Sequence, residues 1–583
     1  MQPVTKILTD IVSSAFGRCG YDPKLGVVAA SDRLDLCQFQ CNGAFAGAKL
    51  YKKAPIMIAE NVAAVLREEG IFSSAEAVAP GFLNLTLNDE YMLKVAKDIE
   101  GDRFLGIPQS EKPQTIVIDY GGPNVAKPLH IGHLRSAVIG ESLKRLAKAC
   151  GNTVYGDVHL GDWGLQIGLV IAELNERYPD WECFKESFNP DTDSVPTLNA
   201  ELLCEVYPFA SKKSKENEEF KAKAHTATFE LQSGRAGYIA LWKEILRTSV
   251  ADLKSNYQRL DVDFDYWYGE SDADKYIPEL MKILEDKGLS YESNGALVVD
   301  VAEESDKAPM PPVIVRKSDN SSIYATTDLA TIIQREKDFA PDKIWYVVDK
   351  RQELHFTQVF RCARRAKLVP AETELEFLGF GTMNGSDGKP YKTRDGGVMR
   401  LSDLIETVTN ASLERLTSSS FVDEDDREDY ARKLGMAALK FGDLINHRSK
   451  DYIFDLDKFM SAEGKTGIYL LYTVSRINSI MKKAGDFKAE LNGIYTDAER
   501  ELVLKIIMTG NAFSYALDEK APNYICENAY QLAVSFSRFY HENNIMNEQD
   551  EKKKSSWLAL AKLTRAIIVK HLDILGISTV ENM

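Results

Sequence analysis

One stretch constrains the fold of this chain more than any other: a predicted strand that passes through a glycine-rich turn into a predicted helix. The strand is the apolar, β-branched run 115–118, and the turn covers 121–123. His130-Ile-Gly-His133 follows, and apolar residues then recur at helical spacing until Gly151. The sequence therefore places two histidines where a strand passes into a helix.

The start of a helix suits phosphate binding, because its first N–H groups have no partner and its dipole is positive there. Gly132 allows a base or a phosphate to approach the backbone without meeting a Cβ atom. Two histidines three residues apart can both direct N–H groups at phosphate oxygens. The alternative is a pair of surface histidines beside an ordinary turn. The full combination, with Lys127 just before the histidines, favours a nucleotide site.

His130-Ile-Gly-His133 after a strand resembles the signature of the class I aminoacyl-tRNA synthetases, and the longer string 123–136 resembles the arginine enzymes in particular. The resemblance extends over nearly the whole chain. It implies an α/β Rossmann-type parallel-sheet catalytic core with insertions, an N-terminal α+β domain and a C-terminal all-α helical bundle.

The domain boundaries follow from this resemblance and from the helical and strand patterns along the 583 residues. We expect an N-terminal tRNA-contacting α+β domain at 1–110 and a Rossmann catalytic domain at 111–410, with an insertion at about 170–300. The second half of the catalytic sheet is expected to open at 312–319. Linker helices are expected at 411–455, and an α-helical anticodon-binding domain at 456–583.

Composition narrows the cellular setting. The net charge of −16 argues against non-specific nucleic-acid binding by the whole surface. No apolar run is long enough for a membrane span, and the N-terminus lacks a signal-peptide pattern. The eight cysteines contain no CxxC pair, so neither a zinc ribbon nor a disulfide framework is indicated. We therefore expect a cytoplasmic protein with no membrane association and no metal site of its own.

Acids at the ends of predicted strands indicate a cationic substrate. Asp119 closes the strand at 115–118, and Asp328 follows Tyr324 by one helical turn. Carboxyl ends of parallel strands converge on one crevice, so these acids are expected to meet around one cationic side chain. A carboxylate suits the planar fork of a guanidinium, although Asp328 alone is also consistent with an ordinary acid at a helix start.

The resemblance assigns arginine binding to residues at five matching positions: Asp119, Asn124, Tyr324, Asp328 and Gln352. In one place the chain departs from the family, because Thr326-Thr327-Asp328 stands where Thr-Arg-Asp is common. His159-Leu-Gly-Asp-Trp-Gly164 matches a motif expected beside the active site, without an assigned chemical role. The acidic segment 260–271 fits a metal site or a solvated loop, and the solvated loop is favoured.

The loop 384–397 lacks the Lys-Met-Ser-Lys-Ser sequence that class I synthetases usually carry, and Tyr391-Lys-Thr-Arg-Asp395 takes its place. Its Lys392 and Arg394 are expected to bring positive charge to the departing pyrophosphate. Lys127 resembles the lysine that compensates in such variants. The resemblance thus implies catalytic roles for His130, His133, Lys127 and Lys392, and an ATP site formed by His130, Gly132, His133, Lys392 and Arg394. Mg²⁺ is expected to arrive with the ATP phosphates.

Two groups of residues are candidates for tRNA contact. In the N-terminal domain these are Phe39, Gln40 and Asn42, which could stack on and read an unpaired base. In the C-terminal domain they are Tyr469, Tyr472 and Arg476. The alternative for the first group is a core aromatic with capping amides, and for the second it is helix packing.

These inferences predict an arginine–tRNA ligase that uses ATP, L-arginine and tRNA-Arg, and the resemblance implies a monomer. A different class I synthetase and a small nucleotidylyltransferase remain open, although the chain length and the helical C-terminal part disfavour the second. A third alternative is a non-catalytic tRNA-binding paralogue. The intact His130, Gly132, His133, Asn124 and Asp328 speak against that alternative.

Overall fold

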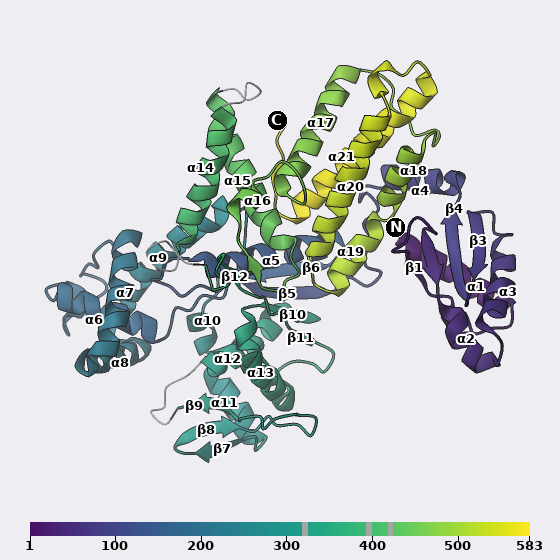
Figure 1. The fold of residues 1–583 in the computed structure, drawn as a ribbon. Coiled ribbons are helices and arrows are strands. Elements are labelled where there is room, and N and C mark those ends of the chain that lie inside the picture. Colours follow the sequence, from purple (N-terminus) through teal and green to yellow (C-terminus); the bar gives the residue numbers. More distant parts are fainter. Residues whose placement is uncertain (318–323, 392–398, 418–423, 583) are drawn as a thin grey trace.

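A parallel sheet forms the centre of the molecule (Figure 1). The computed structural model describes residues 1–317, 324–391, 399–417 and 424–582. The sheet has the strand order β11-β10-β5-β6. Its strands are β5 (Thr115–Tyr120), β6 (Thr153–Asp157), β10 (Lys343–Val347) and β11 (Glu374–Phe377). Nearly all residues of β5 and β10 are buried, which explains their continuous apolar sequences, as expected for strands covered on both faces.

The order of the strands reverses between β5 and β10. From β5 the chain crosses through α5 (Ile131–Ala149) to β6 on one side, whereas from β10 it crosses through α13 (Glu353–Ala366) to β11 on the other side. In open parallel sheets, ligands bind in the crevice at the carboxyl ends of the strands, where the order reverses. The histidine motif at the start of α5 and Gln352 just before α13 both follow strands that border this crevice.

A long insertion separates β6 from β10. Its first part is helical and projects to one side in Figure 1: α6 (Leu165–Arg177), η2 (Glu182–Phe184), α7 (Ala200–Glu216), α8 (Glu218–Gln232) and α9 (Ala236–Arg259). Its second part contains α10 (Glu270–Asp274), α11 (Ile277–Asp286), β7 (Ser290–Ser293), β8 (Ala296–Val299) and β9 (Val313–Arg316). The chain returns to the sheet through α12 (Tyr324–Phe339).

The strand β9 corrects one expectation about the second half of the sheet. Residues 312–319 were expected to open that half, but β9 pairs antiparallel with β8 in a separate three-stranded sheet of order β7-β8-β9. The strand alternates buried and exposed residues from Val313 to Arg316, as a strand with one solvated face does. The second half of the parallel sheet therefore begins at β10.

The N-terminal unit is α+β. It consists of α1 (Val4–Arg18), η1 (Pro23–Leu25), β1 (Val28–Ala30), β2 (Phe39–Cys41), α2 (Gly43–Tyr51), α3 (Pro55–Leu66), β3 (Phe72–Val78), β4 (Phe82–Leu87) and α4 (Asp89–Gly101). The strands form an antiparallel sheet of order β1-β2-β4-β3, and alternate residues of β4 are buried. The unit docks onto the C-terminal helices, where Arg500 binds both carboxylate oxygens of Asp89 at 2.7 Å.

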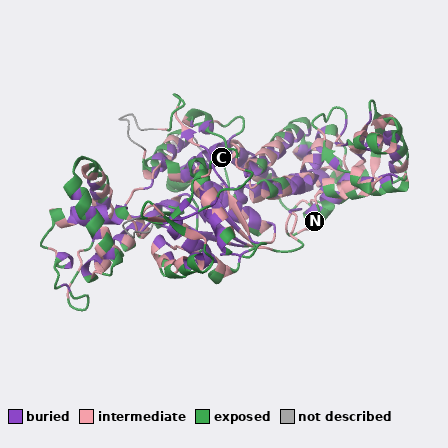
Figure 2. Cartoon of the chain, turned by 90° about the horizontal axis from the view of Figure 1, so that it is seen from below, coloured by how far each residue is buried: buried purple, intermediate pink, exposed green. Residues whose placement is uncertain are grey.

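The C-terminal part is helical apart from the short strands β12 (Met383–Asn384) and β13 (Tyr452–Ile453). Its helices are α14 (Leu401–Thr417), η4 (Glu424–Asp426), α15 (Arg427–Leu444), α16 (Leu456–Phe459), α17 (Gly467–Ala484), α18 (Asp497–Ile507), α19 (Thr509–Asp518), α20 (Asn523–Glu542), η5 (Ile545–Asn547) and α21 (Glu551–Ile574). Buried residues run through the central sheet and the helices packed on it (Figure 2). Within the described ranges, no helix combines the length and apolar character needed to cross a membrane.

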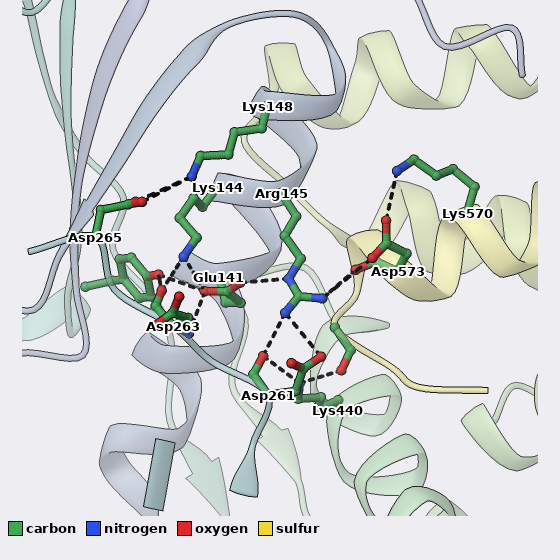
Figure 3. A network of polar contacts seen from close by, with 12 residues as sticks. Glu141, Lys144, Arg145, Lys148, Asp261, Asp263, Asp265, Lys440, Lys570 and Asp573 are labelled. Atoms are coloured by element: carbon green, nitrogen blue, oxygen red, sulfur yellow. Dashed lines mark hydrogen bonds and ion pairs between the residues drawn. The ribbon is translucent and has the colours of Figure 1, made fainter. Parts of the chain in front are cut away.

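Charged residues join α5 to the end of α21, and we call them the junction cluster (Figure 3). Its members are Glu141, Lys144, Arg145, Asp261, Lys440 and Asp573. The Arg145 guanidinium donates to Glu141 Oε1 at 2.7 Å, to the Asp261 carbonyl at 3.0 Å and to the Asp573 carbonyl at 3.1 Å. Lys440 of α15 donates to the Gly576 carbonyl at 2.5 Å. The helix that begins with the histidine motif is thereby fixed to the C-terminal helices.

Candidate active site

The two histidines cap the start of α5 with their own rings. His130 is the N-cap residue, and its Nδ1 accepts from the Gly132 N–H at 3.1 Å, while Nδ1 of His133 accepts from the His130 N–H at 3.1 Å. The ring centroids lie 4.0 Å apart. A Cβ atom on Gly132 would lie 2.8 Å from Cε1 of His130, so only glycine leaves room for this ring. Because Nδ1 accepts in each ring, Nε2–H remains to donate.

Both rings are neutral at physiological pH. Burial, with a contribution from the charge of Lys127, lowers the pKa of His130 to about 4. Burial also lowers the pKa of His133 to about 3, with smaller contributions from His130 and Lys127. Lys127 therefore lies close enough to act electrostatically on both rings. Each histidine can offer one N–H to an anionic oxygen, but neither brings a positive charge.

Asn124 lies against the loop that follows β6. Val125 donates its N–H to the Gly161 carbonyl at 2.9 Å, and Gly161 donates to the Pro123 carbonyl at 3.1 Å. A Cβ atom on Gly161 would meet Asn124 Oδ1 at 2.2 Å. The motif that begins with His159 thus borders the turn leading to the histidine pair. His159 itself has a φ of +42° and lies between Asp157 of β6 and Thr331 of α12.

The two predicted pocket acids have different partners, which corrects the expectation that they meet around one cation. Nη2 of Arg335 donates to Asp119 Oδ2 and to Asp157 Oδ2, both at 2.7 Å, and all three side chains are buried. Burial raises the pKa of Asp119, and the charge of Arg335 opposes this rise. Asp328, about two turns before Arg335 on α12, bonds instead to His355. The chain itself supplies the cation between the ends of β5 and β6.

Asp328 forms a hydrogen bond of 2.6 Å between its Oδ2 and Nε2 of His355, in the first turn of α13. Gln352, the residue before that helix, is exposed. Tyr324 begins α12 with 62% of its surface exposed. Partial desolvation of its hydroxyl raises the pKa of Tyr324, with smaller contributions from Glu270, Tyr207 and Asp328, so both acids lie near it. The structure thus gathers Tyr324 and Asp328 on one side of α12.

Glu270 is a site residue that the sequence did not reveal. The segment 266–270 runs beside the end of β6, with Tyr266 donating to the Gly156 carbonyl at 3.0 Å and Glu270 to the Leu160 carbonyl at 3.0 Å. This pairing buries Glu270 to 8% exposure. Burial raises its pKa to about 8, with contributions from Asp162 and Asp328. The interpretation of 260–271 as a solvated loop is therefore wrong for this residue.

We call Asp162, Glu270 and Asp328 the acid cluster. Asp162 accepts from the Ser271 N–H at 3.0 Å and from its hydroxyl at 2.6 Å. Among the described residues, no positively charged side chain influences the pKa of the Glu270 carboxyl. In the described part of the chain, no group of three or more His, Cys, Asp or Glu side chains is arranged to hold a metal ion. Carboxylates also suit an organic cation that donates several hydrogen bonds, such as a guanidinium.

The remaining predicted catalytic residue, Lys392, and the predicted ATP-binding residue Arg394 lie outside the described residues. Lys392 and Arg394 fall within 392–398, where the structure gives no description. The described Tyr391, just before them, contacts the ring of Phe454 edge-on at 5.3 Å. Ile131 donates its N–H to the Met399 carbonyl at 3.1 Å, and His130 forms a β-bridge with Arg400. The segment that follows the loop thus adjoins the histidine motif.

The candidate tRNA residues divide by burial. Phe39 is fully buried in β2, so the core interpretation holds for this ring, which has no face free for a base. Gln40 donates to Asn84 Oδ1 at 2.9 Å, and Asn42 is exposed before α2 without a side-chain capping bond. On α17, the Tyr469 hydroxyl lies 3.0 Å from Ser537 Oγ. Tyr472 is exposed beside Arg476 on the same helix.

Arg476 lies between aromatic rings of two helices. Its guanidinium carbon is 4.7 Å from the ring centroid of Tyr472 and 5.7 Å from that of Tyr540, and Nη2 donates to the Tyr472 hydroxyl at 2.8 Å. This places a cation and two aromatic rings together at the surface of α17 and α20. Such a combination suits stacking and cation–π contact with an unpaired base.

Comparison with known proteins decides the family. The model for the catalytic domain of class I (R) tRNA synthetases matches residues 97–456, that for the arginyl-tRNA synthetase N-terminal domain matches 3–87, and that for the DALR anticodon-binding domain matches 470–583. The chain belongs to the arginyl-tRNA synthetase family. An arginine–tRNA ligase of Alkaliphilus oremlandii is 48% identical over 587 residues, and one of Agathobacter rectalis is 48% identical over 597 residues, each covering 100% of both chains.

Solved arginyl-tRNA synthetases share the fold of this family member. The enzyme of Plasmodium falciparum superposes with a TM-score of 0.81 at 24% identity and covers 100% of both chains. That of Thermus thermophilus has a TM-score of 0.81 at 20% identity, covering 99% of this chain and 100% of its own. The predicted fold class, a Rossmann-type core between an α+β unit and a helical bundle, is confirmed.

Proposed function

We propose that this protein is an arginine–tRNA ligase, which activates L-arginine with ATP to arginyl-adenylate and transfers it to the 3′ end of tRNA-Arg. The observation that carries the proposal is the acid cluster at the carboxyl edge of a parallel sheet whose adjoining helix begins with the two neutral histidines. A guanidinium is the amino-acid side chain that such acids suit best. The relatives of full-length similarity carry the same activity in their names.

The first step needs placement and charge stabilisation rather than a general base. The arginine carboxylate is already an anion, and it attacks the α-phosphate of ATP as pyrophosphate leaves. Nε2–H of His130 and of His133 donates to phosphate oxygens as negative charge develops, and the absent Cβ of Gly132 leaves room for the His130 ring in this position. Lys127, Lys392 and Arg394 add positive charge. Mg²⁺ is held mainly by the phosphates and water, as this ion prefers.

The arginine pocket lies where α10, α12 and α13 converge. Asp328 and Glu270 bind the guanidinium from two sides, and Tyr324 covers it with its ring and hydroxyl. Asn124 and Gln352 bind the backbone end of the substrate. Asp119 contributes through its bond with Arg335, which fixes the end of β5 to α12. Lysine is rejected because a compact ammonium cannot use sites arranged for a planar fork.

The tRNA contacts are proposed at both ends of the chain. Arg476 and Tyr472 of α17 take part in anticodon binding, with Tyr469 supporting them through Ser537. Gln40 and Asn42 remain candidates in the N-terminal unit. We also propose the division into 1–110, 111–410, 411–455 and 456–583, a monomeric state and a cytoplasmic location.

The test is charging of total tRNA with each of the twenty amino acids, using the purified full-length protein and Mg-ATP. Charging with arginine alone is expected. Charging with another amino acid would retain the synthetase class and overturn the assignment of the acid cluster. Binding of tRNA without any charging would identify a non-catalytic paralogue.

A further inference from the structure

His355 has a short hydrogen bond to the acid at the centre of the proposed pocket. The distance between its Nε2 and Asp328 Oδ2 is 2.6 Å, and the two side chains come from different helices, α13 and α12. The family resemblance assigns this histidine no role. The bond is charge-assisted when Nε2 carries the hydrogen, because the acceptor is a carboxylate, and such bonds are shorter and stronger than neutral ones.

The position of this bond argues against a role in stability alone. The side chain of His355 is 29% exposed and that of Asp328 is 20% exposed, so solvent screens the pair. A partly exposed pair of this kind contributes only modestly to folding. By contrast, Asp328 sits within the acid cluster, where the orientation of its carboxylate determines which oxygen faces a ligand.

The bond leaves the two oxygens of Asp328 in different situations. Oδ2 accepts from His355, whereas no described residue donates to Oδ1. Asp328 can therefore offer Oδ1 to a guanidinium without breaking its own anchor. The second N–H edge of the guanidinium is then met by Glu270, the other acid near Tyr324. This is a two-acid arrangement in which His355 decides the direction of one acid.

We propose that His355 is a positioning residue for arginine recognition, holding the Asp328 carboxylate with Oδ1 directed at the substrate guanidinium. The inference rests on the proposed function, because it assumes that arginine is the substrate. His355 does not touch the reacting atoms. Its loss is therefore expected to weaken arginine binding while leaving the chemical step nearly unchanged.

The experiment measures tRNA charging by the full-length protein and three variants: His355→Ala, His355→Gln and a control, His225→Ala, in which an exposed histidine of α8 is removed. The KM for arginine is expected to rise about tenfold in His355→Ala, the equivalent of one hydrogen bond to a charged group. The KM for ATP and kcat are expected to stay within about twofold. His355→Gln retains an N–H donor and is expected to restore most of the arginine affinity.

A double-mutant cycle separates a positioning role from any other. If His355 acts through Asp328, adding His355→Ala to Asp328→Ala should raise the KM for arginine no further. Additive effects would overturn the proposal, as would an unchanged KM in His355→Ala. A Gln variant no better than the Ala variant would also count against it. If the wild-type protein charges tRNA only with another amino acid, the proposed function fails first, and the role of His355 fails with it.

Discussion

The junction cluster and the acid cluster are two groups of charged residues whose buried carboxyl groups have pKa values shifted in opposite directions. In the junction cluster, burial would raise the pKa of Glu141, but Lys144 and Arg145 outweigh it, and the pKa is lowered. In the acid cluster, burial and two neighbouring acids raise the pKa of Glu270 to about 8. One cluster is neutralised by the chain's own cations and holds helices together. In the other, no cation of the described residues acts on the Glu270 carboxyl, as a site for a positively charged ligand requires.

The largest effect is expected at the centre of the acid cluster. Asp328→Ala should raise the KM for arginine by about 30-fold or more, because truncating one side of a buried charge pair costs about 2–5 kcal/mol. The KM for ATP should change much less, and the temperature of unfolding should stay near that of the wild type. Steady-state charging kinetics and thermal unfolding provide the check. Equal increases in the two KM values would contradict the role of Asp328.

The opposite outcome is expected in the junction cluster. Glu141→Gln leaves the buried Lys144 without its carboxylate partner at 3.0 Å, and breaking such a pair costs about 3–5 kcal/mol. The variant should unfold at a lower urea concentration, whereas the KM for arginine of the folded protein should be unchanged. A rise in that KM with unaltered unfolding would show that the two clusters are not distinct in function.

The sequence predicted those helices, strands and turns whose structure depends on residues close together in the chain. The strand β5, the turn and the helix α5 were all evident, because burial on both faces and helical spacing leave direct traces in the residues. The histidine motif also indicated the position of the crevice, because it stands where a strand passes into a helix. The sequence could not show whether Phe39 lies in the core or on a binding face, because an aromatic residue in a short strand fits both equally well. Its burial in the structure assigns it to the core.

The partners of the acids could not be predicted from the sequence. Asp119 meets Arg335, more than 200 positions away, and the pairing of segment 266–270 with β6 buries Glu270. Such contacts depend on tertiary packing and leave no periodic pattern. A role for His355 could have been predicted from the sequence, because it lies three positions after Gln352, on the first turn of α13.

The raised pKa of Glu270 predicts that arginine binding by the acid cluster depends on pH. Its carboxyl ionises as pH rises through about 8, and only the ionised form attracts a guanidinium, so the wild-type KM for arginine should fall across this range. Glu270→Gln should lose this dependence and have a KM about tenfold higher at pH 9, the equivalent of one charged hydrogen bond. Charging assays between pH 7 and about 9 would test this expectation.

Glu270→Gln is also expected to change the free energy of unfolding in the direction opposite to Glu141→Gln. The raised pKa means that folded Glu270 keeps a proton that the unfolded chain releases above about pH 4.3. The resulting stability is present below that pH and is lost as pH rises through about 8. Glu270→Gln avoids this loss and should be at least as stable as the wild type at pH 9. Destabilisation there would mean that the chain itself neutralises the acid cluster.

The smallest effect is expected at Lys440. Burial lowers the pKa of its ammonium group to about 7. In the unfolded chain a lysine keeps its proton up to about pH 10.4, so the unfolded state binds more protons between pH 7 and that value. Stability from this group therefore rises with pH above about 7. Lys440→Met loses the bond to the Gly576 carbonyl at every pH, but it should also lack this rise. Unfolding temperatures of the two proteins should therefore diverge between pH 7 and about 9. Parallel profiles would show that Lys440 remains charged in the fold, held by the carboxylates of Asp261 and Glu141.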